Sequence, residues 1–441
     1  MLHIGITGQS GFLGTHLYNH LGLQPGAALV PFERRAFEPY ASDPGADPKA
    51  FDTGTSADGN TLCDWVRQCD VIIHLAALNR HPEPETLYET NVALVDRLIH
   101  AMEATGARPH VLFSSSTQEE KDNPYGRSKA EGRKRLSAWA QRNGATFTGL
   151  VIPNVFGPFG LPFYNSVVAT FCHQLTHGET PRIEVDGVLK LIYVDNLVKA
   201  IWRLIQEPAW AQATGGHGHT APTGHAGADA APGSLAHVIP DGDAAPDGHT
   251  DAIPDGDHHA YTVPADAEIT VSALLRLLEG FRADYFDKGV IPALAGPFEL
   301  NLFNTFRSFI DQRSFFPKTL TRHADDRGAF VEIARTHPGG QVSFSTTLPG
   351  ITRGEHFHTR KIERFAVLRG QARIALRRIG TDEVLAFDLD GDKPSFVDMP
   401  VWYTHNITNT GNGELLTLFW INEFFDPTDP DTYFVKVNPP L

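Results

Sequence analysis

The chain has 441 residues, 41% of them hydrophobic, and its 37 lysines and arginines against 52 aspartates and glutamates give a formal net charge of -15. This length predicts about two or three domains, with cores large enough to fold without disulfides. The acidic balance argues against binding of nucleic acid or of an anionic membrane, because both require clustered positive charge. The 3 cysteines are too few and too scattered for a disulfide framework or a cysteine-based zinc site. No apolar run reaches the ~20 residues that span a bilayer, and the first strand begins without a signal peptide, so we expect a cytoplasmic protein.

Residues 1 to about 208 alternate short apolar runs with amphipathic stretches. Continuous apolar runs, typical of buried strands, are Leu2–Thr7, Ala28–Phe32, Asp70–Leu75, His110–Ser114 and Thr146–Ile152. Between them, apolar residues recur every three or four positions, as in helices, over Gly11–Leu21, Leu87–Thr105 and Tyr125–Arg142. Strands that alternate with helices predict a Rossmann-type, doubly wound parallel α/β sheet.

A glycine motif follows the first predicted strand and opens the first predicted helix, in the sequence Thr7-Gly8-Gln9-Ser10-Gly11-Phe12-Leu13-Gly14. Glycines allow a tight turn and a close approach of the backbone to a pyrophosphate, and the N-terminus of the helix attracts the phosphates. This context predicts a dinucleotide site formed by Gly8, Ser10, Gly11, Phe12, Leu13 and Gly14.

The end of the second predicted strand bears on the choice of cofactor. Glu33 would favour the ribose hydroxyl of NADH, whereas Arg34 or Arg35 would favour the 2′-phosphate of NADPH. Two adjacent arginines favour NADPH, with Arg34 as the expected contact.

A tyrosine and a lysine, Tyr125 and Lys129, lie one helical turn apart and project from the same face of a predicted helix. A nearby ammonium stabilises a phenolate, so we expect Lys129 to lower the pKa of Tyr125. The tyrosine could then exchange a proton with a substrate oxygen while a nicotinamide exchanges a hydride. The preceding strand ends in hydroxyl side chains suited to orient a reacting carbonyl, Ser114-Ser115-Ser116-Thr117.

Residues from about Ala209 to Ala260 are rich in Gly, Ala, Pro, Asp and His and contain no Lys, Arg or Glu. The segment has too few apolar residues to offset the entropy of ordering, so it is predicted to be a disordered insert. Its Asp and His residues suggest metal binding, but loosely spaced histidines form no preorganised site. A helical pattern resumes at Ile269–Arg282, so the first domain is expected to continue beyond the insert.

Residues from about 315 to 441 contain short strand-like runs separated by Gly, Pro and Asn turns, a pattern typical of an all-β sandwich or barrel. The runs are Phe330–Ile333, Val342–Thr347, Phe365–Leu368, Ala372–Leu376, Ser395–Asp398 and Leu415–Trp420.

A candidate metal site lies within this all-β region. His356 and His358, two residues apart on a strand, face the same side, and Glu363 and His405 can complete a set of three nitrogens and one oxygen. Such ligands suit zinc, iron, nickel or manganese and leave room for substrate.

Residues 1 to roughly 310 resemble the extended short-chain dehydrogenase/reductase family. The resemblance rests on the motifs above and on His74-Leu75-Ala76-Ala77 and Asn154-Val155-Phe156-Gly157-Pro158. It implies a reaction at a nucleotide-sugar hydroxyl or ketone, with Leu75, Ala76 and Lys129 at the cofactor. The implied catalytic set is Ser116, Tyr125 and Lys129, with Ser115 or Thr117 as alternatives to Ser116. Dehydration is disfavoured, because Gln118 stands where family dehydratases carry an Asp-Glu pair.

The spacing of the metal ligands resembles both motifs of the cupin family, except that Trp402 stands where the second motif usually has glycine. Asp325-Asp326-Arg327-Gly328 and Gln341-Val342 resemble the sugar-nucleotide 3,5-epimerase branch of cupins. Those enzymes do not normally depend on a metal, whereas this chain retains the ligands. Asp326 or Arg327 has either a substrate role or a role in packing or a dimer interface.

Nearly the whole chain resembles the bifunctional capsular and O-antigen enzymes that make the UDP-N-acetyl-L-fucosamine precursor. Resembling segments include Leu78-Asn79-Arg80, Tyr164-Asn165-Ser166-Val167 and Tyr403-Thr404-His405-Asn406, whereas the insert and Ala41–Asn60 depart from that family. The resemblance implies a reductase domain over residues 1–312, a cupin domain over residues 313–441, and zinc as the metal. It implies substrate contacts from Asn154, Tyr164 and Asn165.

The implied reaction has two stages: C3 epimerisation of a UDP-2-acetamido-2,6-dideoxy-4-keto-hexose in the cupin, then NADPH-dependent reduction to UDP-2-acetamido-2,6-dideoxy-L-talose. Epimerisation must come first, because the ketone acidifies the hydrogen on carbon 3 and reduction removes that ketone. Lys361, Tyr403 or Glu363 could act as the base at carbon 3.

Three other readings stay open. The cupin could serve only dimerisation or metal sensing, the enzyme could be a 4-epimerase with tightly held NAD, or the protein could be a scaffold whose Asp/His tract collects metal. Cupin barrels commonly associate, so a homodimer is expected by analogy.

Overall fold

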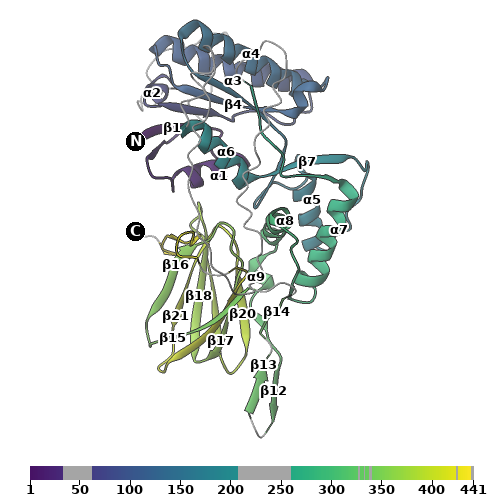
Figure 1. Ribbon diagram of the computed structural model, residues 1–441, viewed down its shortest axis with the longest axis vertical. Helices are drawn as coiled ribbons and strands as arrows, with labels where there is room; N and C mark the ends of the chain where they lie inside the picture. Colours follow the sequence, from purple (N-terminus) through teal and green to yellow (C-terminus); the bar gives the residue numbers. More distant parts are fainter. Residues whose placement is uncertain are drawn as a thin grey trace, which may run out of the picture.

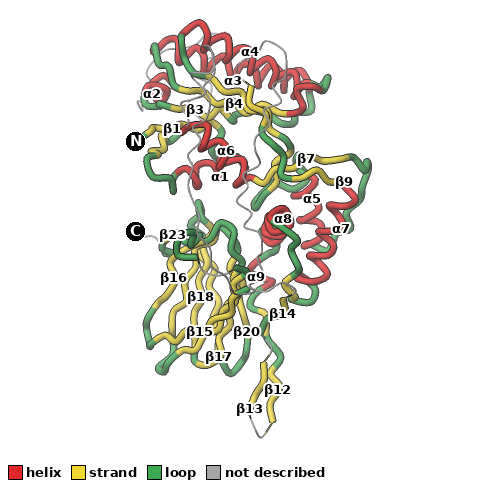
Figure 2. The backbone as a smooth tube through the Cα atoms, in the orientation of Figure 1, coloured by secondary structure: helices red, strands yellow, loops and turns green. Residues whose placement is uncertain are grey.

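The computed structural model describes residues 1–32, 62–206, 260–325, 328–331, 333–336, 340–423 and 426–438. An α/β part lies at the top of Figure 1, an antiparallel β barrel lies at the bottom, and a smaller part with helices α5, α7 and α8 lies beside them. Figure 2 shows that the barrel is built from strands and loops, whereas helices cover the sheet of the α/β part. Both predicted fold classes, the Rossmann-type sheet and the all-β cupin barrel, are confirmed.

A six-stranded parallel sheet forms the α/β part, in the order β2-β1-β3-β4-β5-β8. Its strands are β1 (Leu2–Thr7), β2 (Ala27–Val30), β3 (Val71–His74), β4 (His110–Ser116), β5 (Phe147–Ile152) and β8 (Ala260–Thr262). From β1 the chain passes to β2 on one side of β1, and it later returns as β3 on the other side of β1. The loops after β1 and β3 therefore diverge and open a crevice at the carboxyl ends of the strands.

Helices pack on both faces of this sheet and bury two apolar clusters, one centred on α1 and α6 and the other on α2, α3 and α4. Prolines in the first turn start α3 and α4, and Gly106 and Gly144 end them in the left-handed region, with φ of 69° and 61°. The elements are α1 (Phe12–Leu21), α2 (Leu62–Arg67), α3 (Pro84–Thr105), the 3₁₀ helix η2 (Thr117–Glu120), α4 (Pro124–Asn143) and α6 (Val194–Gln206).

The predicted insert, Ala209–Ala260, lies outside the described residues except for Ala260, and Arg34 and the segment Ala41–Asn60 lie outside them as well. Ala260 is the first residue of β8, which pairs in parallel with β5, so the chain returns to the sheet that it left. That the first domain continues beyond the insert stays a prediction.

The smaller part carries a three-stranded sheet, β6-β7-β9, and the helices that connect the sheet region to the barrel. One buried cluster contains Phe303 and Phe306 on α8 together with Val397 and Trp420 of the barrel. The elements are β6 (Asn154–Phe156), α5 (Val167–Thr176), β7 (Val188–Tyr193), β9 (Ala267–Thr270), α7 (Val271–Phe281), the π-helix η4 (Arg282–Phe286), α8 (Pro297–Arg307) and α9 (Gln312–Phe315). The predicted domain boundary at residue 312 stays a prediction.

Two five-stranded antiparallel sheets face each other in the barrel, in the orders β11-β20-β17-β22-β15 and β19-β18-β21-β16-β23. Their strands are β11 (Lys318–Thr319), β15 (Gln341–Thr347), β16 (Thr352–Phe357), β17 (Glu363–Arg369), β18 (Gln371–Arg378), β19 (Val384–Asp390), β20 (Ser395–Met399), β21 (Tyr403–Asn409), β22 (Leu415–Ile421) and β23 (Tyr433–Phe434). Outside these sheets lie β10 (Val290–Ile291), which pairs with β14 (Arg335–Thr336), and the hairpin of β12 (Arg322–Asp325) and β13 (Gly328–Val331). Asp326 and Arg327 lie outside the described residues.

Candidate active sites

A cavity of about 1090 Å³ opens at the carboxyl ends of the parallel strands. With the exception of Arg34, it brings together the residues that the sequence assigns to cofactor, chemistry and substrate in the α/β part. They are Gly8, Ser10, Gly11, Phe12, Leu13, Gly14, Leu75, Ala76, Ser116, Tyr125, Lys129, Asn154, Tyr164 and Asn165.

The glycine loop has the shape that a dinucleotide requires. Gly8 has a φ of 74°, and a Cβ on Gly14 would lie 2.1 Å from the carbonyl oxygen of Gly8. The main-chain N–H groups of Leu75 and Ala76 donate to the Thr7 hydroxyl, which holds the two loops of the crevice together. Side chains at either glycine would be strained or would clash, so the close backbone approach expected for a pyrophosphate fits these residues.

The buried Lys129 is held next to the sheet. Its Nζ donates to the carbonyl oxygen of Ser114 at 2.8 Å and to the Ser114 hydroxyl at 3.3 Å, and burial lowers its pKa to about 8. Its ammonium lies 5.7 Å from the centre of the Tyr125 ring. Burial, with a smaller effect from Tyr164, raises the pKa of Tyr125 to about 12. The expectation that Lys129 lowers this pKa is wrong for the protein alone, because the ammonium is directed to Ser114 and burial dominates.

Two of the candidate catalytic hydroxyls, those of Ser115 and Ser116, differ in their hydrogen bonds. The Ser115 hydroxyl donates to Glu119, which also pairs with Arg133, whereas the Ser116 Oγ accepts a main-chain N–H from Gln118 and has no other hydrogen bond within the described ranges. The Ser116 hydroxyl hydrogen is therefore still available to a substrate oxygen in the cavity.

Arg80 was not singled out for a role from the sequence. Its Nε donates to Asn165 Oδ1 at 2.6 Å, and its Nη1 donates to the carbonyl of Phe163 at 3.2 Å. The guanidinium also lies 5.9 Å from the centre of the Tyr164 ring. Arg80 thus fixes the loop that presents both predicted substrate residues; from the sequence it stood out only as part of the resembling segment Leu78-Asn79-Arg80, with no role of its own.

The four predicted metal ligands come together inside the barrel. One ligand atom from each of His356, His358, Glu363 and His405 lies within 4.8 Å of the others. The Nε2 atoms of His358 and His405 lie 3.1 Å and 3.3 Å from the same atom, Glu363 Oε2. Burial opposes ionisation of Glu363, but the contacts with the two imidazoles outweigh it and hold the pKa of Glu363 well below its usual range.

The hydrogen bonds of the imidazoles show how the set fits a cation. His358 Nδ1 faces the carbonyl oxygen of Asp431 at 2.5 Å, and His405 Nδ1 faces that of Tyr403 at 3.3 Å. A carbonyl only accepts, so Nδ1 carries a proton in both rings, and Nε2 is the atom of each ring that faces the carboxylate. Burial opposes protonation of His358, but its contacts with Glu363 outweigh burial and raise its pKa, whereas burial and the neighbouring histidines lower the pKa of His356 to about 4. Three imidazoles that converge on one carboxylate form a ligand set that fits a divalent metal ion.

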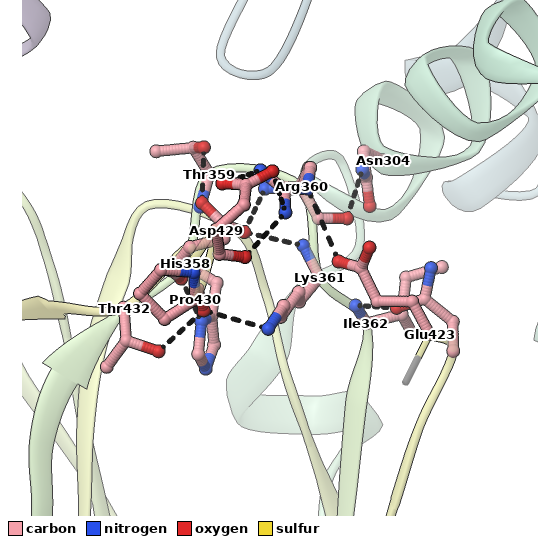
Figure 3. A network of polar contacts seen from close by, with 12 residues as sticks. Asn304, His358, Thr359, Arg360, Lys361, Ile362, Glu423, Asp429, Pro430 and Thr432 are labelled. Atoms are coloured by element: carbon pink, nitrogen blue, oxygen red, sulfur yellow. Dashed lines mark hydrogen bonds and ion pairs between the residues drawn. The ribbon is translucent and has the colours of Figure 1, made fainter. Parts of the chain in front are cut away.

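Asp431 holds the loop between two of these ligands; Figure 3 shows from close by the loop residues Thr359, Arg360 and Lys361 with Asp429, Pro430 and Asn304 around them. Its carboxylate accepts the main-chain N–H groups of Thr359, Arg360 and Lys361 and the Thr359 hydroxyl. On the other side of the loop, Asn304 of α8 donates to the carbonyl of Arg360. From the sequence, Asp431 stands within a segment that resembles the capsular enzymes, Pro430-Asp431-Thr432-Tyr433-Phe434, but it has no predicted role, because it lies 73 residues from His358 and outside both motifs.

The alternative bases at carbon 3 take different places. Lys361 is buried and its Nζ donates to the carbonyl of Pro430 at 2.8 Å. Tyr403 lies two residues before His405 on β21, so both side chains face the barrel interior, and burial raises the pKa of Tyr403.

Trp402 joins the barrel to the glycine-loop helix. It has a φ of 62°, stacks on Phe357 and lies edge-on to His16 of α1, with ring centres 5.9 Å apart. Its main-chain N–H donates to the carbonyl of His358. The left-handed backbone usual for glycine at this position is kept, while the side chain fills the contact between the two parts.

None of the helices in the described ranges is long and apolar enough to cross a membrane.

Comparison with known proteins divides the chain in the same way. Residues 4–215 match the NAD dependent epimerase/dehydratase family, and residues 323–433 match the polysaccharide biosynthesis C-terminal domain. The chain is 30% identical over 434 residues to UDP-2-acetamido-2,6-beta-L-arabino-hexul-4-ose reductase of Pseudomonas aeruginosa, covering 98% of both chains. It is 26% identical over 124 residues to spore coat polysaccharide biosynthesis protein SpsL of Bacillus subtilis, covering 26% of this chain and 82% of that protein.

Among solved structures, the capsular polysaccharide assembling protein CapF from Staphylococcus aureus is similar along its whole length. The two are 30% identical, the alignment covers 99% of this chain and 100% of that one, and the TM-score is 0.53.

Proposed function

The chain belongs to the family of the Pseudomonas aeruginosa UDP-2-acetamido-2,6-beta-L-arabino-hexul-4-ose reductase, and from this premise we propose that it is a bifunctional nucleotide-sugar enzyme of polysaccharide precursor synthesis. It epimerises carbon 3 of a UDP-2-acetamido-2,6-dideoxy-4-keto-hexose in the barrel. It then reduces the 4-ketone with NADPH, giving UDP-2-acetamido-2,6-dideoxy-L-talose.

One observation carries the proposal: a cation site of three imidazoles and a carboxylate stands in the same chain as a dinucleotide cavity with a Ser-Tyr-Lys set. A reductase alone does not need the cation site, and an epimerase of this kind does not need the dinucleotide cavity. The two chemistries share one carbonyl, which acidifies carbon 3 until reduction removes it.

In the reductase cavity, NADPH supplies the hydride to carbon 4 when it is bound. The Ser116 hydroxyl orients the carbonyl oxygen, and Tyr125 donates its proton to that oxygen as the alcohol forms. A pKa raised to about 12 keeps Tyr125 protonated at neutral pH, which suits a donor. Lys129 holds the floor of the cavity through Ser114.

In the barrel, His356, His358, Glu363 and His405 hold a divalent metal, proposed to be zinc, which acts as a Lewis acid on the substrate oxygens when bound. Glu363 is a weak base because of its low pKa, and Lys361 is anchored to Pro430. The proton that leaves carbon 3 passes to solvent, and Tyr403, half-buried and protonated on the inner face, is proposed to deliver a solvent-derived proton to the opposite face, which completes inversion.

Three further parts of the proposal concern residues or partners beyond the two sites. Arg34 is proposed to contact the 2′-phosphate of NADPH, the active unit is proposed to be a homodimer, and the enzyme is proposed to work in the cytoplasm.

The test is to incubate the protein with the 4-keto UDP-sugar and NADPH in heavy water and to locate deuterium in the product by NMR. The proposal expects one deuterium on carbon 3, one equivalent of NADPH consumed, and loss of the label in His358→Ala with ketone reduction retained. Unlabelled carbon 3 would leave a reductase with a non-catalytic barrel. Turnover without net NADPH consumption would indicate a 4-epimerase instead.

A further inference from the structure

Arg378 is the last residue of β18 and stands at the rim of the metal-binding barrel. In the pairing of β18 with β21, Arg378 lies opposite Tyr403 and Leu376 lies opposite His405. Residues directly opposite in an antiparallel pair point to the same face, as do residues two apart on one strand. Arg378 therefore continues the inner face that carries the ligand His405, roughly 7 Å further along the strand.

The guanidinium of Arg378 has no hydrogen bond and no ion pair with any residue in the described part of the chain, and its Nε is buried. Its position is nevertheless fixed, because it lies over the ring of Phe159 at 3.8 Å from the ring centre. Other arginines of the same strand are satisfied: Arg373 pairs with Asp388, and Arg377 donates to three main-chain carbonyls. A half-buried cation without a partner is costly unless a ligand supplies the anion.

Phe159 places this cation next to the reductase cavity. The loop that carries Phe159 also contains Gly157, Gly160 and Leu161, which line the dinucleotide cavity. Phe159 has a φ of 66° and its main-chain N–H donates to the Ser308 hydroxyl, so the loop is held in one conformation. Its aromatic ring faces Arg378 and Tyr403 on the barrel side.

We propose that Arg378 forms an anion subsite of the barrel that binds the diphosphate of the nucleotide sugar while the sugar ring is at the metal ligands. This inference rests on the proposed function, since it names the group that holds the substrate at the same site. A planar guanidinium with free Nη donors matches a phosphate in a bidentate arrangement, and its stacking on Phe159 preorganises that plane. Arg378 lies two residues along β18 from Leu376, the residue opposite His405, which is roughly 7 Å. This distance is comparable to the length of one sugar unit, which separates the reacting part of the sugar ring from the diphosphate.

The test measures phosphorus relaxation of UDP in the presence of protein whose metal site holds Mn²⁺, with NADP⁺ at saturation to occupy the glycine loop. A paramagnetic ion in the barrel broadens the UDP phosphorus lines only if the diphosphate binds close to it. We expect broadening in the unaltered protein and in Arg373→Gln, a matched loss of one arginine from the exposed face of the same strand. We expect Arg378→Gln to weaken this binding at least tenfold, and Zn²⁺ in place of Mn²⁺ to remove the broadening.

Broadening that is absent in the unaltered protein, or that persists in Arg378→Gln at the same UDP concentration, would overturn the subsite. If the protein does not retain Mn²⁺, enzyme kinetics tests the subsite instead. Deuterium exchange at carbon 3 should show a KM raised ten-fold or more in Arg378→Gln with kcat changed less than threefold, and an unchanged KM would equally reject the subsite.

The two proposals fail in different ways. Absence of carbon-3 exchange in the unaltered protein rejects epimerisation, while UDP broadening that depends on Arg378 still establishes the anion subsite. Circular dichroism and the metal content of Arg378→Gln serve as controls for folding.

Discussion

The imidazole of His358 donates its Nδ1–H to the main-chain oxygen of Asp431, at 2.5 Å and across 73 residues of sequence. The same aspartate binds three consecutive main-chain N–H groups of the loop that follows His358. A segment near the C-terminal end thereby sets both the tautomer of one metal ligand and the path of the chain to the next ligand.

Replacing Asp431 should therefore weaken metal binding. In Asp431→Ala, three N–H groups lose their acceptor, so the loop between the ligands is no longer held and the main-chain oxygen that remains can shift away from His358; metal affinity should therefore fall about 10–100-fold. Competition with a chromophoric chelator measures this affinity directly. The matched control is Asp429→Ala, which removes an exposed carboxylate from the same segment and should change the affinity less than threefold. Equal affinities in the two variants would count against a positioning role for Asp431.

Trp402 should stabilise the folded protein more than the glycine that is usual at its position. The side chain is 2% exposed and packs between Phe357 and His16, whereas its φ of 62° costs backbone strain. Loss of the buried ring outweighs relief of that strain, so Trp402→Gly should destabilise the protein by about 2–4 kcal/mol. Urea unfolding checks the value, with Trp402→Phe as a control that should lose less. A variant as stable as the original would show that the ring adds little packing energy.

Tyr125→Phe should remove ketone reduction without affecting exchange at carbon 3. The variant keeps the ring that packs in the cavity and loses only the proton donor, so the reduction rate should fall about 10²–10⁴-fold. NADPH oxidation measures one reaction, and proton NMR in heavy water measures the other. Reduction within tenfold of the original rate would move the donor role to another group.

Tyr403→Phe should give the opposite pattern. Exchange at carbon 3 should fall at least tenfold because the phenol beside His405 is lost, while a substrate already epimerised should be reduced at the original rate. Both rates are measured on one sample, so the retained reduction controls for folding. Unchanged exchange would return the assignment to Lys361 or Glu363.

Buried histidines should make the protein less stable as the pH falls. Burial lowers the pKa of His16 and of His110 to about 4, and burial with a smaller effect of Lys129 lowers that of His74 to about 3. Since the unfolded chain takes up these protons near pH 6.5 and the folded chain does not, stability is present above pH 6.5 and is lost as the pH falls toward 4. Each histidine contributes a slope of up to about 1.4 kcal/mol per pH unit. Urea titrations at pH 7, 6 and 5 should show a smaller slope in His110→Gln, and identical slopes would contradict the assignment for that ring.

Features that depend on neighbouring residues could be predicted from the amino-acid sequence. Strand and helix periodicity, the glycine loop after β1, the Tyr125–Lys129 spacing and the His356–His358 pair have local patterns whose geometry is set within one or two elements. Glu363 and His405 were predicted from motif spacing, and the fold brings β16, β17 and β21 together around the ligands. The sign of the Tyr125 pKa shift was predicted wrongly, because it depends on burial and on Ser114, which takes up the lysine. Three contacts became visible only in the folded chain: Asp431 orients His358, Arg80 holds the Asn165 loop, and Phe159 meets Arg378 between the two sites. These contacts join residues 73 to more than 200 positions apart, and such pairs are selected by the packing of whole elements, which no local pattern encodes.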